Sequence, residues 1–233
     1  DSTDNAPIIE AAAAKLQAEN GGGIIWIPSG IWVVKSTIDI QDKSGIKIMG
    51  IGGRNAVVDD GTHPVNGSAI IWDGPSTGSG STTLKINRSQ NIAVKGVYFA
   101  TWAGEGQTGV DHVDNVIHVS QTGTGGYNTA NIWIEDTGTT FLASNGIIRN
   151  KGVCDTFCRI GDGASTVNCS SVTLVRAGGS RIAQNVVLID GASCTGVHMM
   201  QVCFPQSKRF LHVSSYGGGF TAYTCGSGNN MYE

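Results

Sequence analysis

Residues 4–27 read DNAPIIEAAAAKLQAENGGGIIWI, and this stretch decides the fold. Asn5-Ala6-Pro7 is typical of a helix start, because proline fits the first helical turn. Asn20-Gly21-Gly22-Gly23 ends the helix, since glycine takes the left-handed conformation found at helix C-termini. One face of this helix is apolar, and its residues are Ile8, Ile9, Ala12, Ala13 and Leu16. We therefore predict a short α-helix over residues 6–20.

Brief strands with glycine corners follow the helix. They cover residues 24–27, 31–34 and 46–51, and Gly30, Gly50 and Gly52-Gly53 punctuate them. A helix followed by many short strands indicates a solenoid whose open end the helix covers, because stacked coils need a cap over their core. We expect Trp26 and Trp32, near this end, to lie in the core.

The stretch from Asp4 to Gly53 resembles the N-terminal part of the pectate-lyase superfamily, in the style of bacteriophage tailspikes. The resemblance implies an all-β fold, a single-stranded right-handed parallel β-helix with a short N-terminal capping helix. We expect one such domain over residues 1–233. It also implies a homotrimeric component of a virion tail or surface appendage, extracellular, that contacts other virion proteins. Such tailspikes bind bacterial surface polysaccharide and often cleave it.

Composition narrows the classes of partner. The chain has 233 residues, 34 of them glycine, and a net charge of −3. No cluster of lysine or arginine is present, which argues against nucleic acid, because phosphate binding needs concentrated positive charge. No apolar run approaches the roughly 20 residues of a membrane helix, so membrane insertion is not expected. The chain begins without methionine and ends just after a strand-like run at 220–225, so we expect a segment of a longer protein or a processed product.

Three segments share one pattern of asparagine, alternating apolar residues and a final glycine or aspartate. They are residues 91–96, 131–136 and 185–190. The alternation sends every second side chain inward, and the final residue turns the chain. This alignment predicts that Asn91, Asn131 and Asn185 stack at one corner. It also predicts that Asp136 is a turn residue equivalent to Gly96.

All six cysteines lie in the second half of the chain, at positions 154, 158, 169, 194, 203 and 225. Cys169 and Cys194 are 25 residues apart, and Cys203 and Cys225 are 22 apart, each about one coil. We expect buried thiols in the core, where cysteine behaves as a small hydrophobe. The sequence leaves one or two disulfides open.

An insertion over residues 100–114 lengthens one coil. It is glycine-rich and carries Trp102, Glu105, Asp111, His112 and Asp114. Long loops on a rigid scaffold are where functional residues gather. The G-x-G-x-x-G at residues 104–109 precedes a strand rather than a helix, which argues against a dinucleotide site. The sequence indicates no cofactor and no metal-ligand set.

Cleavage of a glycosidic bond needs two carboxyl groups at a set separation. Glu135 points outward if Ile132 and Ile134 point inward, so it is the better exposed carboxylate. Asp114 and Asp136 are 22 residues apart, about one coil, but the repeat alignment favours a structural turn for Asp136. The predicted catalytic residues are Glu135, Asp111, Asp114 and His112.

Aromatic residues near the insertion can stack on sugar faces. Trp133 lies between Ile132 and Ile134 and is expected to point outward. The predicted substrate-binding residues are Trp102, Glu105, Tyr127 and Trp133.

The sequence does not decide whether the chain is catalytic. If it is an enzyme, hydrolysis of a polysaccharide is favoured over β-elimination. The alternatives are a structural or adhesive β-helix of a virion, and a secreted pectinase-like lyase or hydrolase.

Overall fold

The structure is a computed structural model that describes residues 3–52, 67–75, 80–101, 113–123, 126–141, 154–163, 169–179, 182–191, 193–204, 207–214 and 218–226. Within these ranges the strands form three parallel sheets, which we call sheets A, B and C. Sheet A contains, in order, β1 (Gly23–Ile27), β4 (Ile46–Gly50), β7 (Gln90–Lys95), β10 (Thr129–Glu135), β13 (Cys169–Val175), β16 (Thr195–Met200) and β18 (Gly218–Tyr223).

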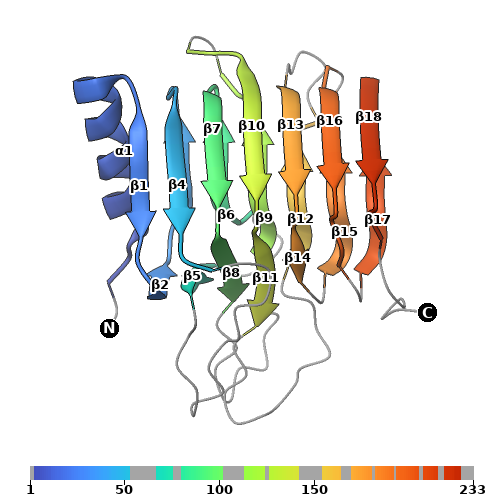
Figure 1. Ribbon diagram of the computed structural model, residues 1–233, viewed down its shortest axis with the longest axis horizontal. Helices are drawn as coiled ribbons and strands as arrows, with labels where there is room; N and C mark the ends of the chain where they lie inside the picture. The colour runs from blue at the N-terminus through green and yellow to red at the C-terminus, as the bar shows by residue number, and fades with distance from the viewer. Residues whose placement is uncertain are drawn as a thin grey trace.

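Sheet B contains β2 (Gly30–Val34), β5 (Ser68–Trp72), β8 (Val97–Thr101), β11 (Gly138–Phe141) and β14 (Gly178–Gly179). Sheet C contains β3 (Ile38–Gln41), β6 (Thr82–Asn87), β9 (Val113–Ser120), β12 (Cys154–Ile160), β15 (Ile182–Ile189) and β17 (Ser207–Val213). The chain passes through sheets A, B and C in turn, and each strand pairs with the strand one coil later. In Figure 1 the strands of sheet A run downward in front while the chain advances from left to right, which makes the solenoid right-handed. The predicted parallel β-helix is confirmed.

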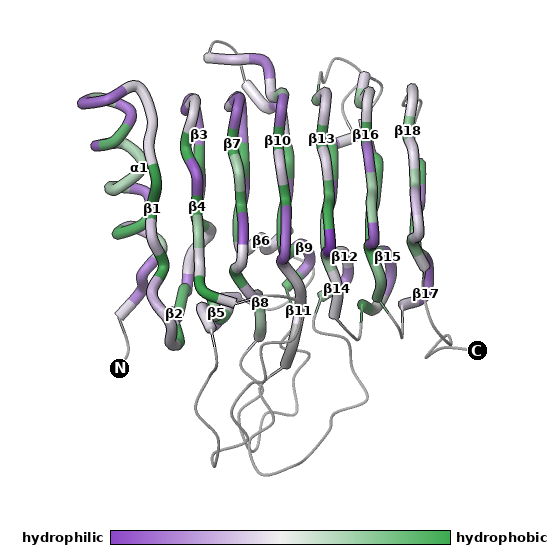
Figure 2. Tube along the Cα trace, viewed as in Figure 1, coloured by the Kyte–Doolittle hydropathy of each residue, from purple (hydrophilic) through white to green (hydrophobic). Residues whose placement is uncertain are grey.

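The core is built from rows of stacked side chains that point inward, one residue per coil. In sheet A one such row contains Ile25, Ile48, Val94, Ile134, Leu174 and Met199, all buried. Hydrophobic and hydrophilic residues alternate along strands such as β10 (Figure 2). Because successive side chains of a strand point to opposite faces, this alternation fixes which face of each strand is buried.

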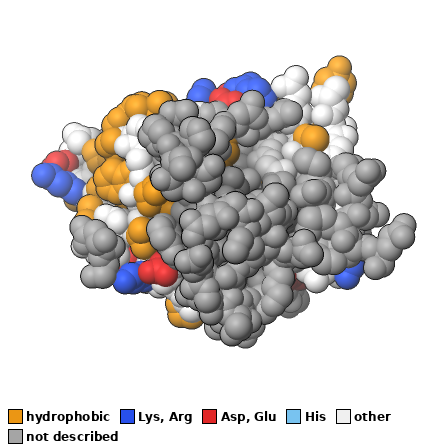
Figure 3. All heavy atoms as spheres, turned by 90° about the horizontal axis from the view of Figure 1, so that it is seen from below, with side chains coloured by type: hydrophobic (Ala, Val, Ile, Leu, Met, Phe, Trp, Pro, Cys, Tyr) orange, Lys and Arg blue, Asp and Glu red, His pale blue; other side chains and the backbone are white. Residues whose placement is uncertain are grey.

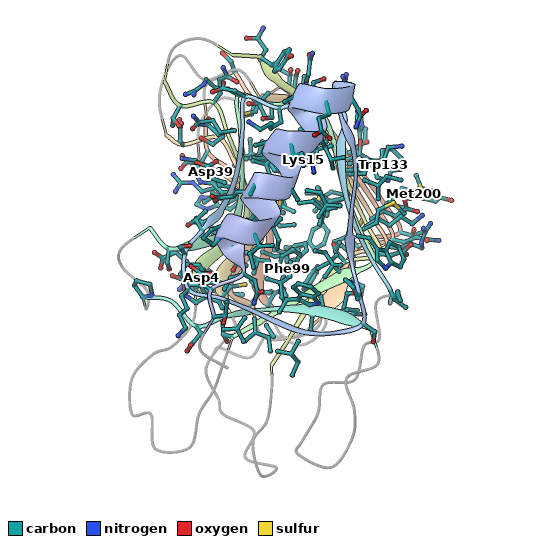
Figure 4. The ribbon with its side chains drawn as sticks, turned by 90° about the vertical axis from the view of Figure 1, so that its left-hand side faces the viewer. Asp4, Lys15, Asp39, Phe99, Trp133 and Met200 are labelled. Atoms are coloured by element: carbon teal, nitrogen blue, oxygen red, sulfur yellow. The ribbon has the colours of Figure 1, made fainter. Side chains whose placement is uncertain are left out.

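The predicted capping helix is α1 (Ala6–Asn20), and Figure 4 shows it lying across the N-terminal end of the solenoid. Ile9 and Ala13 are buried against the core. Gly21 ends the helix with φ +66°, and its N–H donates to the carbonyl of Gln17 at 3.1 Å. Ile8 was expected on the apolar face but is 54% exposed, because the buried stripe passes through Ile9 instead.

The two tryptophans of the first coil differ. Trp32 packs against the core as predicted. Trp26 was expected in the core but is 51% exposed, because Ile25 and Ile27 take the inward positions of β1 and send Trp26 to the outer face.

The predicted asparagine stack is confirmed for two of its three members. Asn131 donates from Nδ2 to Oδ1 of Asn91 at 3.1 Å, and both residues have positive φ, +57° and +56°. Asn185 is not part of this stack, because it lies in β15 of sheet C, beside Thr156 of β12. Ser171 takes the equivalent position one coil after Asn131, because the next residues, Ile132 and Val172, pair in register. Its φ is +54°.

The cysteines are thiols. Cys154, Cys158, Cys169 and Cys194 are buried, as expected of residues in the core, whereas Cys203 and Cys225 are partly exposed. Burial raises the pKa of Cys158 to about 12. The Cys158 thiol therefore acts as a packing group at neutral pH.

The outer faces of sheets A and B differ in exposure. On sheet B, Ala69, Tyr98, Ile71 and Ala100 form small clusters of their own apart from the main core, yet each is at most 3% exposed. Figure 3 views the molecule from the side of sheet B, and hydrophobic side chains show at its N-terminal end, where Ile31 of β2 is 42% exposed. On sheet A, large side chains of the outer face remain open to solvent along the axis, at Ile24, Trp26, Trp133, Met200 and Tyr223.

Candidate functional site

Trp133 and Glu135 lie on the outer face of sheet A, at the middle strand β10. Ile132 and Ile134 point inward and are at most 1% exposed, so the residues between and after them point outward. Trp133 is flanked in register by Ala93 and Thr173, whose short side chains do not cover the indole ring. The ring is consequently 44% exposed, and Figure 4 shows Trp133 and Met200 projecting from the same side of the solenoid. The predicted outward orientation of Trp133 is confirmed.

Glu135 holds this tryptophan in place. The indole Nε1–H of Trp133 donates to Oε2 of Glu135 at 3.0 Å. Nζ of Lys95, on the neighbouring strand β7, lies 3.2 Å from the same oxygen. The guanidinium of Arg176 binds the other oxygen, Oε1. Three donors from three successive coils therefore converge on one carboxylate.

Arg176 and Asp136 occupy the corner where sheet A gives way to sheet B. Both have a left-handed backbone, with φ +50° and +49°, and Gly96 takes the same place one coil earlier with φ +67°. Arg176 binds Asp136 with two hydrogen bonds, Nε to Oδ1 at 2.7 Å and Nη2 to Oδ2 at 2.9 Å. Asp136 is the turn residue that the repeat alignment predicted. Asp190 does not belong to this corner, because it follows β15 of sheet C.

The charges of this cluster favour ionised carboxylates. Partial burial acts to raise the pKa of Glu135, but hydrogen bonds from Trp133, Lys95 and Arg176 outweigh burial and hold that pKa below its ordinary value. The hydrogen bond from Arg176 lowers the pKa of Asp136. A general acid needs a pKa near the working pH, so a raised rather than a lowered value. The geometry of Glu135 thus suits orientation of Trp133 better than proton donation.

The remaining predicted residues lie elsewhere. Tyr127 is 37% exposed, and its N–H donates to the carbonyl of Arg88, directly after β6 of sheet C, whereas Trp133 lies beyond the corner at Asn131, on sheet A. The structure therefore does not bring Tyr127 and Trp133 together. Trp102, Glu105, Asp111 and His112 lie outside the described residues, between the end of β8 and the start of β9.

Asp114 lies on sheet C, on the outer side of β9. Its Oδ2 accepts a hydrogen bond from the backbone N–H of Ser81 at 2.9 Å, and its own backbone N–H donates to Ser81 Oγ at 3.0 Å. Asp155 of β12 stands opposite Asp114, because the flanking residues pair as Cys154 with Val113 and Thr156 with Asn115. Asp136 is on another sheet, so Asp114 and Asp136 do not stack.

Sequence reasoning missed Lys95 and Arg176, and it did not pair Asp155 with Asp114. A signal for Arg176 was present, because residues 172–175 alternate as residues 132–135 do, which puts Arg176 one coil beyond Asp136. Within the described part of the chain, no group of three or more His, Cys, Asp or Glu side chains could hold a metal ion. No described helix is long and apolar enough to cross a membrane.

Comparison with known proteins gives structural relatives only. No protein-family model matches the chain, and no curated protein matches its sequence. Among solved structures, a tailspike protein of Acinetobacter baumannii bacteriophage Fri1, described as a capsular polysaccharide depolymerase, aligns with a TM-score of 0.60 and 14% identity. That alignment covers 97% of this chain and 37% of the tailspike.

A putative glycosyl hydrolase from Parabacteroides merdae aligns with a TM-score of 0.59 and 12% identity, over 97% of this chain and 91% of the hydrolase. A DFA-IIIase from Arthrobacter chlorophenolicus aligns with a TM-score of 0.50 and 12% identity, over 90% of this chain and 55% of that enzyme. At these identities the likeness establishes the fold. The chain is a parallel β-helix similar in architecture to a phage tailspike and to a putative glycosyl hydrolase, and it spans about a third of the tailspike's length.

Proposed function

We propose that this chain is a polysaccharide-binding β-helix of a virion tail component, and that it recognises bacterial surface glycan on the outer face of sheet A. The observation that carries the proposal is the exposed indole ring of Trp133, held by Glu135 at the centre of that sheet. Exposing a large aromatic ring to water is costly unless something covers it. The tailspike and hydrolase relatives, whose names state action on polysaccharide or glycosides, support sugar as the cover.

The arrangement suits a sugar ring chemically. An aromatic face packs against the apolar C–H face of a sugar, and its position is fixed because the indole N–H is already bonded to Glu135. Lys95 and Arg176 both bind Glu135, the partner of the indole N–H, and carry further N–H donors that can bind sugar hydroxyl groups. Because their charges are balanced by Glu135 and Asp136, the site requires no charged ligand.

The test is binding of the purified chain to a panel of capsular polysaccharides, lipopolysaccharides and pectin, measured by calorimetry. Trp133→Ala should weaken binding to the recognised polysaccharide about tenfold, since a stacking contact is worth about 1.4 kcal/mol. Trp26→Ala is the matched control, because Trp26 is exposed on the same sheet three strands away. Equal affinity of Trp133→Ala and the parent protein would contradict the proposal. Absence of binding to any host glycan would favour a purely structural virion β-helix.

Hydrolysis is a second candidate, favoured by the opposition of Asp114 and Asp155 on neighbouring coils. Paired strands lie about 4.8 Å apart, and the carboxyl groups of retaining glycosidases lie about 5–5.5 Å apart. The sequence-predicted catalytic set of Glu135, Asp111, Asp114 and His112 stays a prediction. Release of reducing ends from the bound polysaccharide measures hydrolysis, and ultraviolet absorbance of an unsaturated product measures β-elimination.

The two carboxylate sites can be separated by conservative variants. If the Asp114–Asp155 pair is catalytic, Asp155→Asn abolishes cleavage while binding is retained. If Glu135 is catalytic, Glu135→Gln abolishes cleavage while binding is retained. A cleavage rate that survives both variants would exclude both assignments.

We propose further that the protein works outside the bacterial cell as a homotrimer joined to other virion proteins. The tailspike likeness supports a place on a virion tail. The trimer is what the resemblance of residues 4–53 implies. Light scattering on the purified chain should give the mass of three chains, and a monomeric mass would count against the assembly.

A further inference from the structure

A column of small polar side chains runs along the corner between sheets C and A, with one member per coil. Its members are Ser89, Thr129, Cys169 and Cys194, each at most 1% exposed. Each side chain donates to a backbone carbonyl at the end of a sheet C strand. The acceptors are Ile40 O at 3.0 Å, Ser120 O at 2.6 Å, Val119 O at 3.7 Å and Ile160 O at 3.6 Å. Cysteine thus replaces a hydroxyl residue in the last two described members of the column.

The two thiols are direct neighbours across one coil. Thr129 pairs with Cys169 in the parallel register, and Ser170 pairs with Thr195, so Cys169 lies beside Cys194. Strands paired in this way are about 4.8 Å apart. Disulfides form between Cα atoms about 4.4–6.8 Å apart, so the backbone already meets the distance requirement.

The thiols also interact with each other. The contact with Cys194 and burial raise the pKa of Cys169, whereas the contact with Cys169 lowers the pKa of Cys194 although burial acts to raise it. Cys194 is therefore the thiol that reaches the nucleophilic thiolate form first, since the thiolate rather than the thiol attacks a disulfide.

We propose that Cys169 and Cys194 form an inter-coil disulfide in an oxidising environment, by exchange with a small-molecule disulfide such as oxidised glutathione. Both thiols are buried in the folded chain, so the exchange occurs while the chain folds. The Cys194 thiolate attacks one sulfur of the oxidant, forms a mixed disulfide and releases one reduced thiol. The Cys169 sulfur then attacks the Cys194 sulfur of that mixed disulfide and releases the second. The net reaction converts two protein thiols and one oxidised disulfide into one protein disulfide and two small thiols, so electrons and protons balance.

The other cysteines are placed less well for pairing. Cys154 and Cys158 lie four residues apart on β12, about 13 Å at the usual strand rise. Cys203 bridges to Gly226, so Cys225 is out of register with it by one residue. A one-residue offset sends side chains to opposite faces of a strand. The proposed Cys169–Cys194 disulfide would close one coil of the chain, between residues 169 and 194. It would thus link two neighbouring coils covalently.

The test refolds the full chain from denaturant in a buffer of oxidised and reduced glutathione, then counts thiols in denaturant with a thiol-specific dye. We expect four of the six thiols to remain. Trypsin cleaves after Arg159, Arg176, Arg181 and Lys208, which puts Cys169 and Cys194 on different peptides. Cleavage with cyanogen bromide after Met199 then separates Cys194 from Cys203. A mass matching the Cys169–Cys194 link supports the proposal, whereas six free thiols or a different pairing overturns it.

Serine variants test the consequence. The double variant Cys169→Ser and Cys194→Ser should fold, because Ser89 and Thr129 fill equivalent places in the column. The parent protein should melt roughly 5–10 °C higher when oxidised than when reduced, given the usual stabilisation by a disulfide in a chain of this size. The double variant should lose this difference, and the control Cys203→Ser with Cys225→Ser should keep it. A redox-dependent melting temperature that persists in the Cys169 and Cys194 double variant, or is lost in the control, overturns the proposal.

Discussion

At the scale of single residues, left-handed backbone positions define both ends of the sheet A strands. Asn91, Asn131 and Ser171 have φ between +54° and +57° at the entry corner. Asp136 and Arg176 have φ of +49° and +50° at the exit corner. A left-handed conformation costs most residues about 1–2 kcal/mol. The cost is smaller for asparagine and aspartate, because their short side chains can form hydrogen bonds with the nearby backbone. These corners therefore explain why asparagine and aspartate flank the strands.

Replacement of Asn131 tests the asparagine stack. Asn131→Ala should lower the free energy of unfolding by about 1–2 kcal/mol, because alanine tolerates the left-handed backbone poorly and the bond to Asn91 is lost. Asn131→Gly loses the same bond but relieves the backbone, so it should cost less. Urea unfolding of both variants measures the difference. A glycine variant as unstable as the alanine variant would show that backbone conformation is not the cause.

His118, on the outer side of sheet C, should make stability depend on pH. Burial lowers its pKa to about 4, and its Nε2–H donates to the carbonyl of Gly161 at 2.7 Å. The unfolded chain, with an ordinary histidine pKa of 6.5, binds the proton first. His118 therefore stabilises the fold fully above pH 6.5, and this contribution is lost as the pH falls towards 4.

Between pH 6.5 and pH 4, the free energy of unfolding should fall by about 2–3 kcal/mol through His118. Urea unfolding at neutral pH and at about pH 5 measures it. His118→Gln is the control, because glutamine can donate the same bond without titrating in this range. The fall in stability between the two pH values should be smaller in His118→Gln than in the parent protein. An identical fall in both proteins would assign the pH dependence to other groups.

At the scale of elements, α1 closes the N-terminal end of the core. Ile9 and Ala13 are buried, whereas Ile8 beside them is 54% exposed. The helix contacts β1 and β3, strands of the first coil. The helix thus covers the inward-pointing side chains of the first described coil.

Truncation of the two neighbouring isoleucines tests this capping role. Ile9→Ala should lower the free energy of unfolding by about 2–5 kcal/mol, the usual loss for a buried isoleucine. Ile8→Ala, at an exposed position, should change it by less than about 0.5 kcal/mol. Equal losses in the two variants would mean that α1 does not cap the core.

Sequence patterns predicted single helices and strands correctly more often than they predicted which residues stack on one another in successive coils. The bounds of α1 and the outward position of Trp133 follow from local signals, a proline, three glycines and a two-residue alternation. Trp26 was misplaced because all residues from Ile24 to Ile27 are apolar, which hides the alternation. Asn185 was misaligned because coils differ in length, so a count of residues does not give the sheet on which a residue lies. The Glu135 cluster joins three coils, and only the parallel register brings Lys95 and Arg176 to it.

At the scale of the whole molecule, the sheets differ in how much of their outer faces is exposed to solvent. Sheet A presents exposed side chains along its length, whereas the outward residues of β5 and β8 on sheet B are buried. The core of stacked rows supplies a rigid support, since each coil is bonded to its neighbours on both sides. An aromatic ring fixed on such a support needs little ordering when a ligand binds, which favours affinity.

We expect sugar to bind over Trp133 on sheet A. The most direct measurement is a crystal structure of the chain with an oligosaccharide cut from the polysaccharide it recognises. That structure should show a sugar ring stacked on the Trp133 indole, with hydroxyl groups bonded to Lys95 or Arg176. A sugar bound on sheet B or sheet C, with the Trp133 ring left bare, would contradict it.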